Sequence, residues 1–449
     1  MIAPATCDLA ILGAGAAGMF AALRADALGL RVALFDPSWS TPNNLWLSGG
    51  LFPAAGSALQ SAGGVADTPE HWLQDLRQFA GASCNERIAG SVAQALPSVV
   101  AILQQLQVPV RFLADVPAPG HRVARFHSVT PASGAELHAQ LRAALGRCHR
   151  LQVHADVGVT QIVRAGDGFT LAYPDGRWHA SHLLLAGGGF GAAPDMVAAF
   201  IPEMAGALHS GATSQDGSTI ALARGWGAAV GGMDGYQGQG HTHPDGRTRL
   251  GMSIPTLGGI MVNRSGARFV REDSGPSALA ARVLAQPGQL ALEVFDARIE
   301  QRLGNHSAYA AARGAGRVLE ADDLETLAQH AQVPLDALRE SVELAQRCAQ
   351  QQAHDPLGRC DFTHALQAPF RASWVTGSLA HTQGGLLTDG DARVLDQEHR
   401  PMDGIHAAGG CAAGLSGHGG DGYLPGNGLA QSFGLALRAV EHLAGVTRG

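Results

Sequence analysis

The chain has 449 residues and a formal charge of −7, from 31 basic and 38 acidic side chains. This length predicts two or three domains, and 46% hydrophobic residues provide ample material for a core. The mildly acidic charge excludes an electrostatic footprint for nucleic acid or anionic lipid, and the composition argues against disorder. The six cysteines form no CxxC pair, so the sequence gives no support for a metal site.

The absence of lysine excludes further classes of enzyme. All basic residues are arginine, whereas Schiff-base enzymes and Walker-type kinases need an ammonium side chain. The N-terminus has no charged segment before its apolar run, and no 18-residue apolar span follows. We therefore expect neither a signal peptide nor a transmembrane segment, and a cytoplasmic location with free thiols.

Residues 6–36 have the pattern of a strand, a tight turn, a helix and a second strand. The turn carries Gly13, Gly15 and Gly18, and the second strand ends at Asp36. In this context the first glycine permits the turn, the second admits a pyrophosphate at the helix N-terminus, and the third allows close helix–strand packing. The acid lies 18 residues after the last glycine and can accept hydrogen bonds from a ribose. The segment therefore predicts dinucleotide binding.

The rest of the chain predicts a discontinuous domain with an insertion. After several helical stretches, an apolar strand runs into Gly187 and Gly188, which suit a second contact with the dinucleotide or a plain exit to a loop. From 232 to 365 the pattern becomes mixed strand and charged helix, and then the first pattern returns. The expected fold class is α/β: a Rossmann-like domain formed by 1–231 and 366–449, with an inserted α+β capping domain at 232–365.

Several segments, taken together and in order, resemble one family. They are the N-terminal βαβ unit, NNLWLSGGLFPAAG (43–56), ATSQDGSTIALARGWGA (212–228), GGIMVNRSGARFVRED (258–273), AHTQGGLLTD (380–389) and GIHAAGGCAAG with GYLPGNGLA (404–430). The chain is similar to the soluble members of the fumarate reductase/succinate dehydrogenase flavoprotein family, which includes tricarballylate dehydrogenase and the 3-ketosteroid dehydrogenases. This resemblance spans nearly the whole chain and implies an FAD-binding domain with a capping domain.

The resemblance also implies an FAD-dependent oxidoreductase with a small-molecule substrate and a separate electron acceptor or donor. A hydride moves between the flavin and one carbon of a C–C bond beside a carbonyl or carboxylate, and a proton moves at the neighbouring carbon. The implied FAD contacts are Gly13, Gly15, Ala16, Ala17, Gly18, Asp36, Asn43, Asn44, Ser48, Gly49, Gly50, Gly187, Gly188, Asp216, Gly409, Gly410, Gly426, Asn427, Gly428 and Leu429. Because Asn43 replaces the histidine that carries FAD covalently in membrane-bound relatives, we expect non-covalent binding.

Three departures from the family pattern concern carboxylate recognition. Dicarboxylate-specific members use two arginines and a Thr–Glu pair, and the matching positions here are Tyr423, Pro276 and Met252 with Ser253. The sequence therefore predicts that the substrate is not of the fumarate or succinate type. Under a shifted alignment, three arginines become candidates instead: Arg247, Arg249 and Arg271. They would fit an enoate or tricarboxylate substrate.

The tyrosine that replaces an arginine indicates a different ligand. Tyr423 resembles the tyrosine with which 3-ketosteroid dehydrogenases donate to a ketone oxygen, and the Gly428 N–H would be the second donor. The segment GYLPGNG is one residue longer than the usual one in those enzymes. His381, in HTQGG, matches a substrate-facing histidine that can donate to a substrate oxygen or act as a base. The alternative is a structural histidine that holds the loop.

Three further residues are candidates for catalysis. His241 and His243 both lie near the position of another substrate-binding histidine of the family, and Tyr236 could serve as the base. The sequence thus predicts oxidation or reduction of a CH–CH bond next to a carbonyl. Two alternatives remain: an enoate or tricarboxylate enzyme that uses capping-domain arginines, and a non-catalytic flavin-binding redox sensor.

Overall fold

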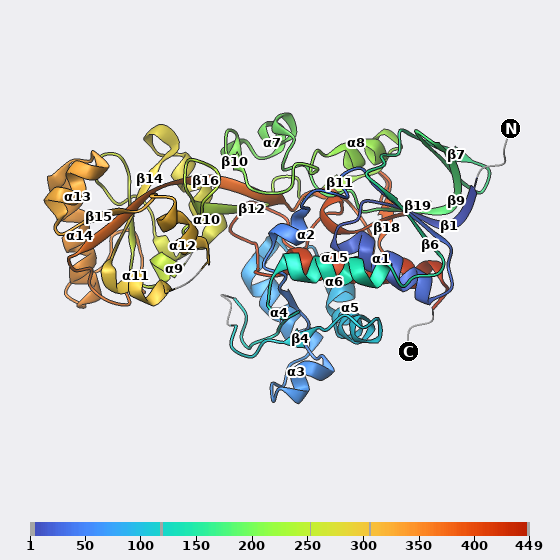
Figure 1. Ribbon diagram of the computed structural model, residues 1–449, viewed down its shortest axis with the longest axis horizontal. Helices are drawn as coiled ribbons and strands as arrows, with labels where there is room; N and C mark the ends of the chain where they lie inside the picture. Colours follow the sequence, from blue (N-terminus) through green and yellow to red (C-terminus); the bar gives the residue numbers. More distant parts are fainter. Residues whose placement is uncertain (1–4, 117–119, 252, 305–306, 447–449) are drawn as a thin grey trace. The chain divides into compact units, whose positions relative to one another are not determined.

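The chain divides into two compact units, which are described separately. The computed structural model describes residues 5–116, 120–251, 253–304 and 307–446. Unit 1 comprises Met1–Met196, Gly211–Tyr236 and His381–Gly449, and unit 2 comprises Val197–Ser210 and Gln237–Ala380. The predicted capping segment 232–365 lies in unit 2 apart from residues 232–236. Figure 1 labels the elements of both units.

A mostly parallel sheet forms the centre of unit 1. Its strands follow the order β18-β19-β9-β1-β2-β6, and β8 pairs with β9 and with β7. Their bounds are β1 (Ala5–Leu12), β2 (Val32–Asp36), β6 (Leu151–Ala155), β7 (Gln161–Ala165), β8 (Gly168–Tyr173), β9 (Gly176–Leu185), β18 (Arg393–Leu395) and β19 (Pro401–Ala407). Because β1, β2, β9 and β19 are parallel, their carboxyl ends meet at one edge of the sheet, where such sheets bind ligands.

Three helices pack together beside this sheet. They are α1 (Ala16–Ala27), α5 (Glu86–Gln105) and α15 (Asn427–Leu443). The rings of Phe20 in α1 and Phe433 in α15 meet edge to face, with centroids 5.5 Å apart. The other elements of unit 1 are α2 (Asn44–Leu47), β3 (Phe52–Pro53), α3 (Ala58–Ala62), α4 (Pro69–Ala80), β4 (Arg111–Phe112), β5 (Phe126–Ser128), α6 (Gly134–Leu145), α8 (Ser218–Gly225), β11 (Val230–Gly231) and β17 (Gly385–Leu386). The helix α7 (Pro194–Phe200) begins in unit 1 and ends in unit 2.

One helix of the described residues, α5, is long and apolar enough to cross a membrane. More than half of its apolar window is buried inside the fold. The buried side chains recur at helical spacing, as in Ile88, Val92, Leu96 and Val99. A side chain at Gly434 of α15 would meet Val92 closely, so the two helices are in tight contact. Packing within unit 1 therefore accounts for the apolar face of α5.

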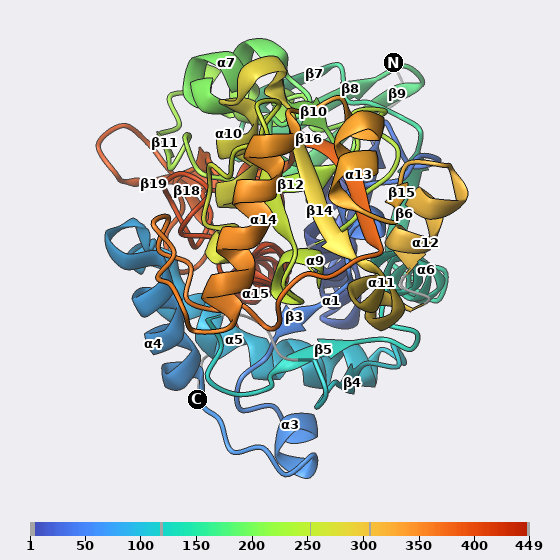
Figure 2. The same ribbon diagram turned by 90° about the vertical axis from the view of Figure 1, so that its left-hand side faces the viewer.

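A second sheet organises unit 2. Its order is β10-β16-β14-β13, and β12 and β15 also pair with β16. The strands are β10 (Leu208–His209), β12 (Tyr236–Thr242), β13 (Ile260–Val262), β14 (Ala291–Asp296), β15 (Leu319–Ala321) and β16 (Phe370–Thr382). The first residue of β12 and the last two residues of β16 belong to unit 1. The helices are α9 (Ser253–Thr256), α10 (Pro276–Leu284), α11 (Ala297–Leu303), α12 (Ser307–Gly314), α13 (Leu324–Ala331) and α14 (Leu335–Ala349). Figure 2 faces these elements, with α13 and α14 in front.

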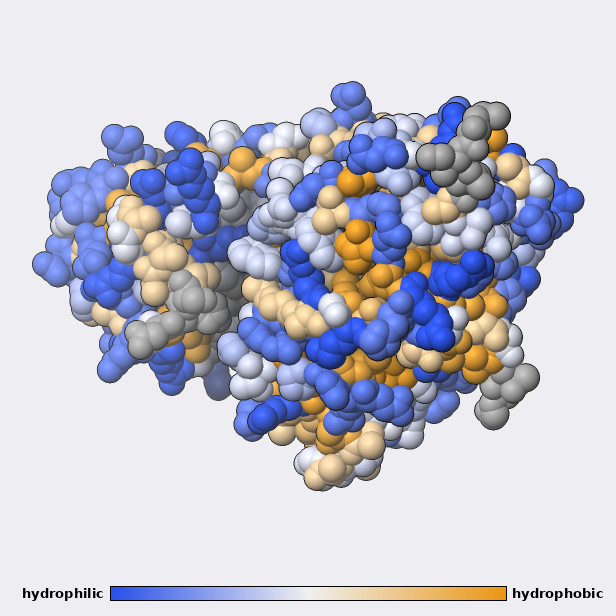
Figure 3. Space-filling view, turned by 45° about the vertical axis from the view of Figure 1, so that its right-hand side comes forward, coloured by the Kyte–Doolittle hydropathy of each residue, from blue (hydrophilic) through white to orange (hydrophobic). Residues whose placement is uncertain are grey.

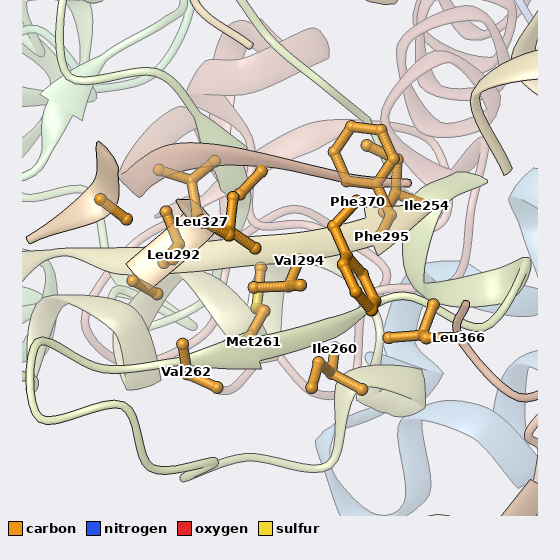
Figure 4. Close-up of a cluster of buried hydrophobic side chains, with 14 of the residues drawn as sticks. Ile254, Ile260, Met261, Val262, Leu292, Val294, Phe295, Leu327, Leu366 and Phe370 are labelled. Carbon is orange, nitrogen blue, oxygen red and sulfur yellow. The ribbon is translucent and has the colours of Figure 1, made fainter. Parts of the chain in front are cut away.

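Unit 2 has its own hydrophobic core. Ile260 and Met261 of β13 meet Val294 and Phe295 of β14, and all four side chains are fully buried (Figure 4). Burial of this kind contributes about 1.5–3 kcal/mol per large side chain. The core lies within one unit, so it stabilises that unit independently of the other.

Unit 1 contains a cluster of histidines away from the glycine turn. His182, His406 and His442 line a pocket of about 190 Å³ together with Arg393. His406 is 2% exposed, and neither of its ring nitrogens has a hydrogen-bond partner among the residues that the structure describes. Burial, together with the two neighbouring histidines, lowers the pKa of His406 from 6.5 to about 3. The imidazole is therefore neutral in the folded protein at neutral pH.

We expect His406→Leu to make unfolding less sensitive to acid. Below pH 6.5 the unfolded parent chain binds a proton that the folded chain excludes, so the stability of the parent falls as the pH drops toward 3. At pH 5 this loss amounts to about 2 kcal/mol, and the variant lacks it. Urea unfolding at pH 8 and pH 5 measures the difference. His149→Leu, at an exposed histidine, is the control; equal pH dependence in parent and His406→Leu would contradict the prediction.

Candidate active site

The turn between β1 and α1 leaves the helix N-terminus open. Gly13 has φ of +104°, and a Cβ there would collide with the Ala186 carbonyl oxygen. A Cβ on Gly18 would collide with the Gly13 carbonyl oxygen. Gly15 is the N-cap of α1 without a side-chain cap, and a Cβ there would meet nothing within 4 Å. Two glycines are thus required by packing, while the third borders free space at uncapped backbone N–H groups.

Polar side chains hold this turn in place. Asp36 accepts hydrogen bonds from Ala14 N–H at 2.6 Å and from Ser38 N–H at 2.7 Å, one on each carboxylate oxygen. Each oxygen keeps a second lone pair for a ribose hydroxyl. Asn43 donates to the Ala14 carbonyl at 3.1 Å and accepts from Trp46 N–H at 3.1 Å. The Asp36 carboxylate therefore also stabilises the turn, a role that its position in the sequence does not reveal.

The other predicted cofactor contacts gather where β9 and β19 end. A Cβ on Gly410 would lie 2.9 Å from the Gly189 backbone nitrogen, so the two glycine loops are in contact. Gly188 and Gly409 both have positive φ, +84° and +73°. Strand β9 pairs in parallel with both β1 and β19, so these two loops lie at the same sheet edge as the turn between β1 and α1.

Three of the predicted FAD-binding side chains accept hydrogen bonds from backbone N–H groups of the protein. Asn44 accepts from Ala212 N–H at 2.7 Å, and the Ser48 hydroxyl accepts from Gly50 N–H at 3.0 Å. Asp216 accepts from the Ser218 N–H at 2.9 Å at the start of α8. The remaining predicted contacts lie at the starts of helices or in glycine loops: Ala16, Ala17, Gly49, Gly187, Gly426, Asn427, Gly428 and Leu429.

Buried glutamines support the glycine loops, and sequence reasoning missed them. Gln215 accepts from Gly189 N–H at 2.7 Å. Gln431 of α15 donates to the carbonyls of Gly409 at 3.2 Å and Ala412 at 3.0 Å. Gln215 lies in the family segment 212–228, but no spacing singles out either glutamine. Their partners are backbone atoms of other segments, which the sequence alone does not bring near them.

The two leading catalytic candidates lie side by side in unit 1. The rings of Tyr423 and His381 are 5.4 Å apart between centroids, at an angle of 74°. Both border the first turn of α15, because a Cβ on Gly428 would lie 3.4 Å from His381 Nε2 and 3.5 Å from Tyr423 Oη. Burial raises the pKa of Tyr423 to about 12, although the Gly428 N–H opposes this shift. Burial also lowers the pKa of His381. At neutral pH the site therefore offers a protonated phenol and a neutral imidazole.

The structure does not gather all the predicted catalytic residues in one unit. Tyr236 is buried in unit 1, and its N–H donates to the Gly419 carbonyl at 3.1 Å. His241 and His243 belong to unit 2. His241 is 1% exposed with Nδ1 3.0 Å from Glu293 Oε1, whereas His243 is partly exposed. The catalytic roles of all three stay predictions.

The predicted losses of carboxylate-binding residues have structural counterparts in unit 2. Pro276 is the first residue of α10, where it offers no side-chain proton donor. Ser253 begins α9, and Met252 lies outside the described residues. Arg271 is half-exposed and paired with Asp273 at 2.6 Å. Arg249 is partly buried and donates to the Ser210 carbonyl at 3.0 Å. Burial lowers its pKa, and no carboxylate of the described residues opposes this shift.

A family comparison agrees with this geometry. Residues 8–429 match the family described as FAD binding domain. The chain belongs to this family. The match covers the glycine turn of β1 and α1, both later glycine loops and the segment that carries Tyr423.

Two relatives and two solved structures illustrate the range of proteins to which this chain is similar. A probable fumarate reductase of Shewanella frigidimarina is 27% identical over 95% of this chain and 73% of its own length. The 4-oxocyclohexanecarboxylate 2-dehydrogenase of Sinomonas cyclohexanicum is 32% identical over 41% of this chain and 40% of its own. The open form of a flavocytochrome c3 fumarate reductase superposes with a TM-score of 0.82 at 26% identity, covering 98% of this chain and 79% of that one. A 3-ketosteroid Δ1-dehydrogenase of Sterolibacterium denitrificans superposes at 0.80 with 20% identity, covering 98% and 100%.

These findings confirm the predicted family, the α/β fold class and the FAD cofactor. The protein is an FAD-dependent oxidoreductase of the fumarate reductase family, whose members act on C=C bonds. The individual site residues and the predicted domain boundaries stay predictions.

The residues of unit 1 fit FAD in a non-covalent mode. The open space at Gly15 and the uncapped N-terminus of α1 suit a pyrophosphate, and Asp36 retains lone pairs for a ribose. The Asn43 amide, engaged on both its atoms, offers no nucleophile for a covalent link. Figure 3 shows apolar residues gathered in the middle of the displayed face of unit 1, between hydrophilic side chains. When bound, the flavin supplies a hydride acceptor or donor.

Proposed function

We propose that the enzyme oxidises a CH–CH bond beside a ketone in a largely apolar substrate and passes the electrons to a separate acceptor. The observation that carries this proposal is the pairing of Tyr423 with His381 at the start of α15. In dicarboxylate enzymes of the family, the resemblance places an arginine at the tyrosine position. A neutral phenol recognises an uncharged oxygen, whereas a guanidinium recognises an anion.

Each of the two side chains has a task in this reaction. The Tyr423 hydroxyl, protonated at neutral pH, donates to the ketone oxygen and stabilises the enolate charge that develops there. We expect the Gly428 N–H, which also acts on the Tyr423 oxygen, to be the second donor. The neutral His381 can accept the proton released from the carbon next to the carbonyl. The name of the relative that oxidises 4-oxocyclohexanecarboxylate supports a ketone-bearing substrate.

Anaerobic titration of the FAD-loaded protein tests this proposal. A cyclic ketone such as cyclohexanone or a 3-ketosteroid should bleach the oxidised flavin. Fumarate or acrylate should reoxidise the chemically reduced protein only slowly. The reverse pattern would favour a reductase of unsaturated acids. No response to either class would contradict both and leave a flavin-binding redox sensor.

A second candidate function is the reduction of an enoate, and Arg249 favours it. A partly buried guanidinium without a carboxylate partner among the described residues can bind a substrate carboxylate. We expect Arg249→Met to raise the KM for a carboxylate-bearing substrate by roughly 10-fold to 100-fold, while an uncharged ketone is unaffected. Steady-state kinetics on both substrates measure this. Arg339→Met removes an exposed arginine of the same unit, one that pairs with Asp336, as the control.

A further inference from the structure

Gln383 has a buried side chain with no assigned role in the proposed reaction. It lies two residues after His381 and is 3% exposed. Its backbone is fixed on both sides, because its N–H donates to the Gly235 carbonyl at 2.7 Å and its carbonyl accepts from Gly414 N–H at 2.6 Å. The side chain therefore starts from a rigid position. Its amide nitrogen lies 3.2 Å from His381 Nδ1.

The Nδ1 atom of His381 faces two partners of different character. The Thr382 carbonyl oxygen, 3.2 Å away, can only accept a hydrogen bond. The Gln383 amide can donate through its nitrogen or, turned by 180°, accept through its oxygen. Gln383 Oε1 has no partner among the described atoms in its present orientation. Nδ1 thus keeps a hydrogen-bond partner whether or not it carries the proton.

The hydrogen-bond partner of Nδ1 also affects the other ring nitrogen of His381, Nε2. His381 Nε2 lies toward Gly428 and Tyr423, on the side of the reacting groups. A neutral imidazole carries one proton, so the state of Nδ1 decides whether Nε2 is an acceptor or a donor. Tyr423 is a titratable group that faces the ring, and no carboxylate of the described residues acts on the pKa of His381. The amide is therefore an uncharged partner at a position where a carboxylate would hold the imidazole protonated.

We propose that Gln383 is a positioning residue for His381: its amide holds Nδ1 without adding a charge beside the buried ring. With the amide oxygen turned toward Nδ1–H, Nε2 is free to accept a proton and later to return it. The inference rests on the proposed function for the meaning of that proton. The contact itself and its effect on the imidazole are independent of the substrate. Glutamine suits this task because the same amide can donate to Nδ1 or accept from it, whereas a glutamate carboxylate can only accept, and its charge would favour the protonated ring.

The test compares Gln383→Glu with the parent by ¹⁵N NMR of histidine-labelled, FAD-loaded protein, with His381→Gln to assign the signal. In the parent, His381 should stay neutral below the ordinary histidine pKa. In Gln383→Glu, its titration midpoint should rise by at least one pH unit, a 10-fold gain in proton affinity. Gln397→Glu adds the same charge at another glutamine of unit 1, one that donates to the Ala228 carbonyl, and should leave the midpoint unchanged. An unchanged midpoint in a folded Gln383→Glu would overturn the proposal.

A second variant separates positioning from charge. Gln383→Met keeps the volume but removes the hydrogen bond, and should lower kcat about 10-fold with little change in KM. With an active ketone substrate, the acid limb of the pH profile of kcat/KM should move to higher pH in Gln383→Glu and stay in place in Gln383→Met. If no ketone is turned over, the proposed function fails while the NMR midpoint still decides the role of Gln383. Equal kcat in Gln383→Met and the parent would contradict the positioning role.

Discussion

Gly15→Val is expected to give a folded protein that no longer retains FAD. The backbone of Gly15 is extended, with φ of −75° and ψ of −167°, so a branched side chain is tolerated there. Its Cβ would meet no protein atom within 4 Å and would project into the space before α1. A pyrophosphate needs that space and the uncapped N–H groups beside it. We expect FAD affinity to fall by roughly 100-fold or more, about 3 kcal/mol, measured by the flavin content of purified protein and by titration with FAD.

The control for Gly15→Val must separate cofactor exclusion from damage to the fold. Gly225→Val adds the same side chain at another open glycine of unit 1, in α8, and should keep the flavin. Far-UV circular dichroism of FAD-free protein should be the same for both variants and the parent. A yellow Gly15→Val protein would show that the space at the start of α1 does not hold the pyrophosphate.

The parts of the site that the sequence predicted well are those set by local rules. Gly13 and Gly18 are needed because a Cβ at either would strike a backbone oxygen, and such needs appear as fixed spacing along the chain. The neighbouring strands follow from the apolar runs that end in glycine, since buried parallel strands are apolar on both faces. Tyr423 was predicted from its position in a segment, and the structure places it beside His381.

The parts that sequence reasoning missed depend on contacts between distant segments. Gln215 and Gln431 bond backbone atoms that only the folded chain brings near them, and glutamine has no periodic signature. Gln383 lies two residues from His381, but the sequence does not show that its amide turns back to the ring. The sequence could not separate His241 from His243 either. The two histidines are only two residues apart, and their difference in burial is visible only in the structure. The Glu293 that pairs with His241 lies 52 residues further along.

Tyr423→Phe is expected to lower kcat for a ketone substrate about 100-fold while FAD stays bound. The change removes one hydroxyl and keeps the ring that packs edge to face against His381. Burial holds the phenol in its protonated form, so the parent presents an O–H donor across the whole neutral range. Loss of one such donor to a developing oxyanion amounts to about 3 kcal/mol in the transition state. Stopped-flow reduction of the flavin by the ketone measures the step directly.

The pattern of kinetic constants distinguishes a role in recognition from a role in the transition state. A donor that strengthens as charge develops on the oxygen should lower kcat and leave KM nearly unchanged, whereas a donor that only binds the ketone should raise KM. Tyr173→Phe removes a hydroxyl from a partly exposed ring on β8 and should alter neither constant. Equal kinetic constants for Tyr423→Phe and the parent on a ketone substrate would show that Tyr423 does not bind the ketone oxygen. The second candidate function, reduction of an enoate with Arg249 as the carboxylate-binding residue, would then be the better proposal.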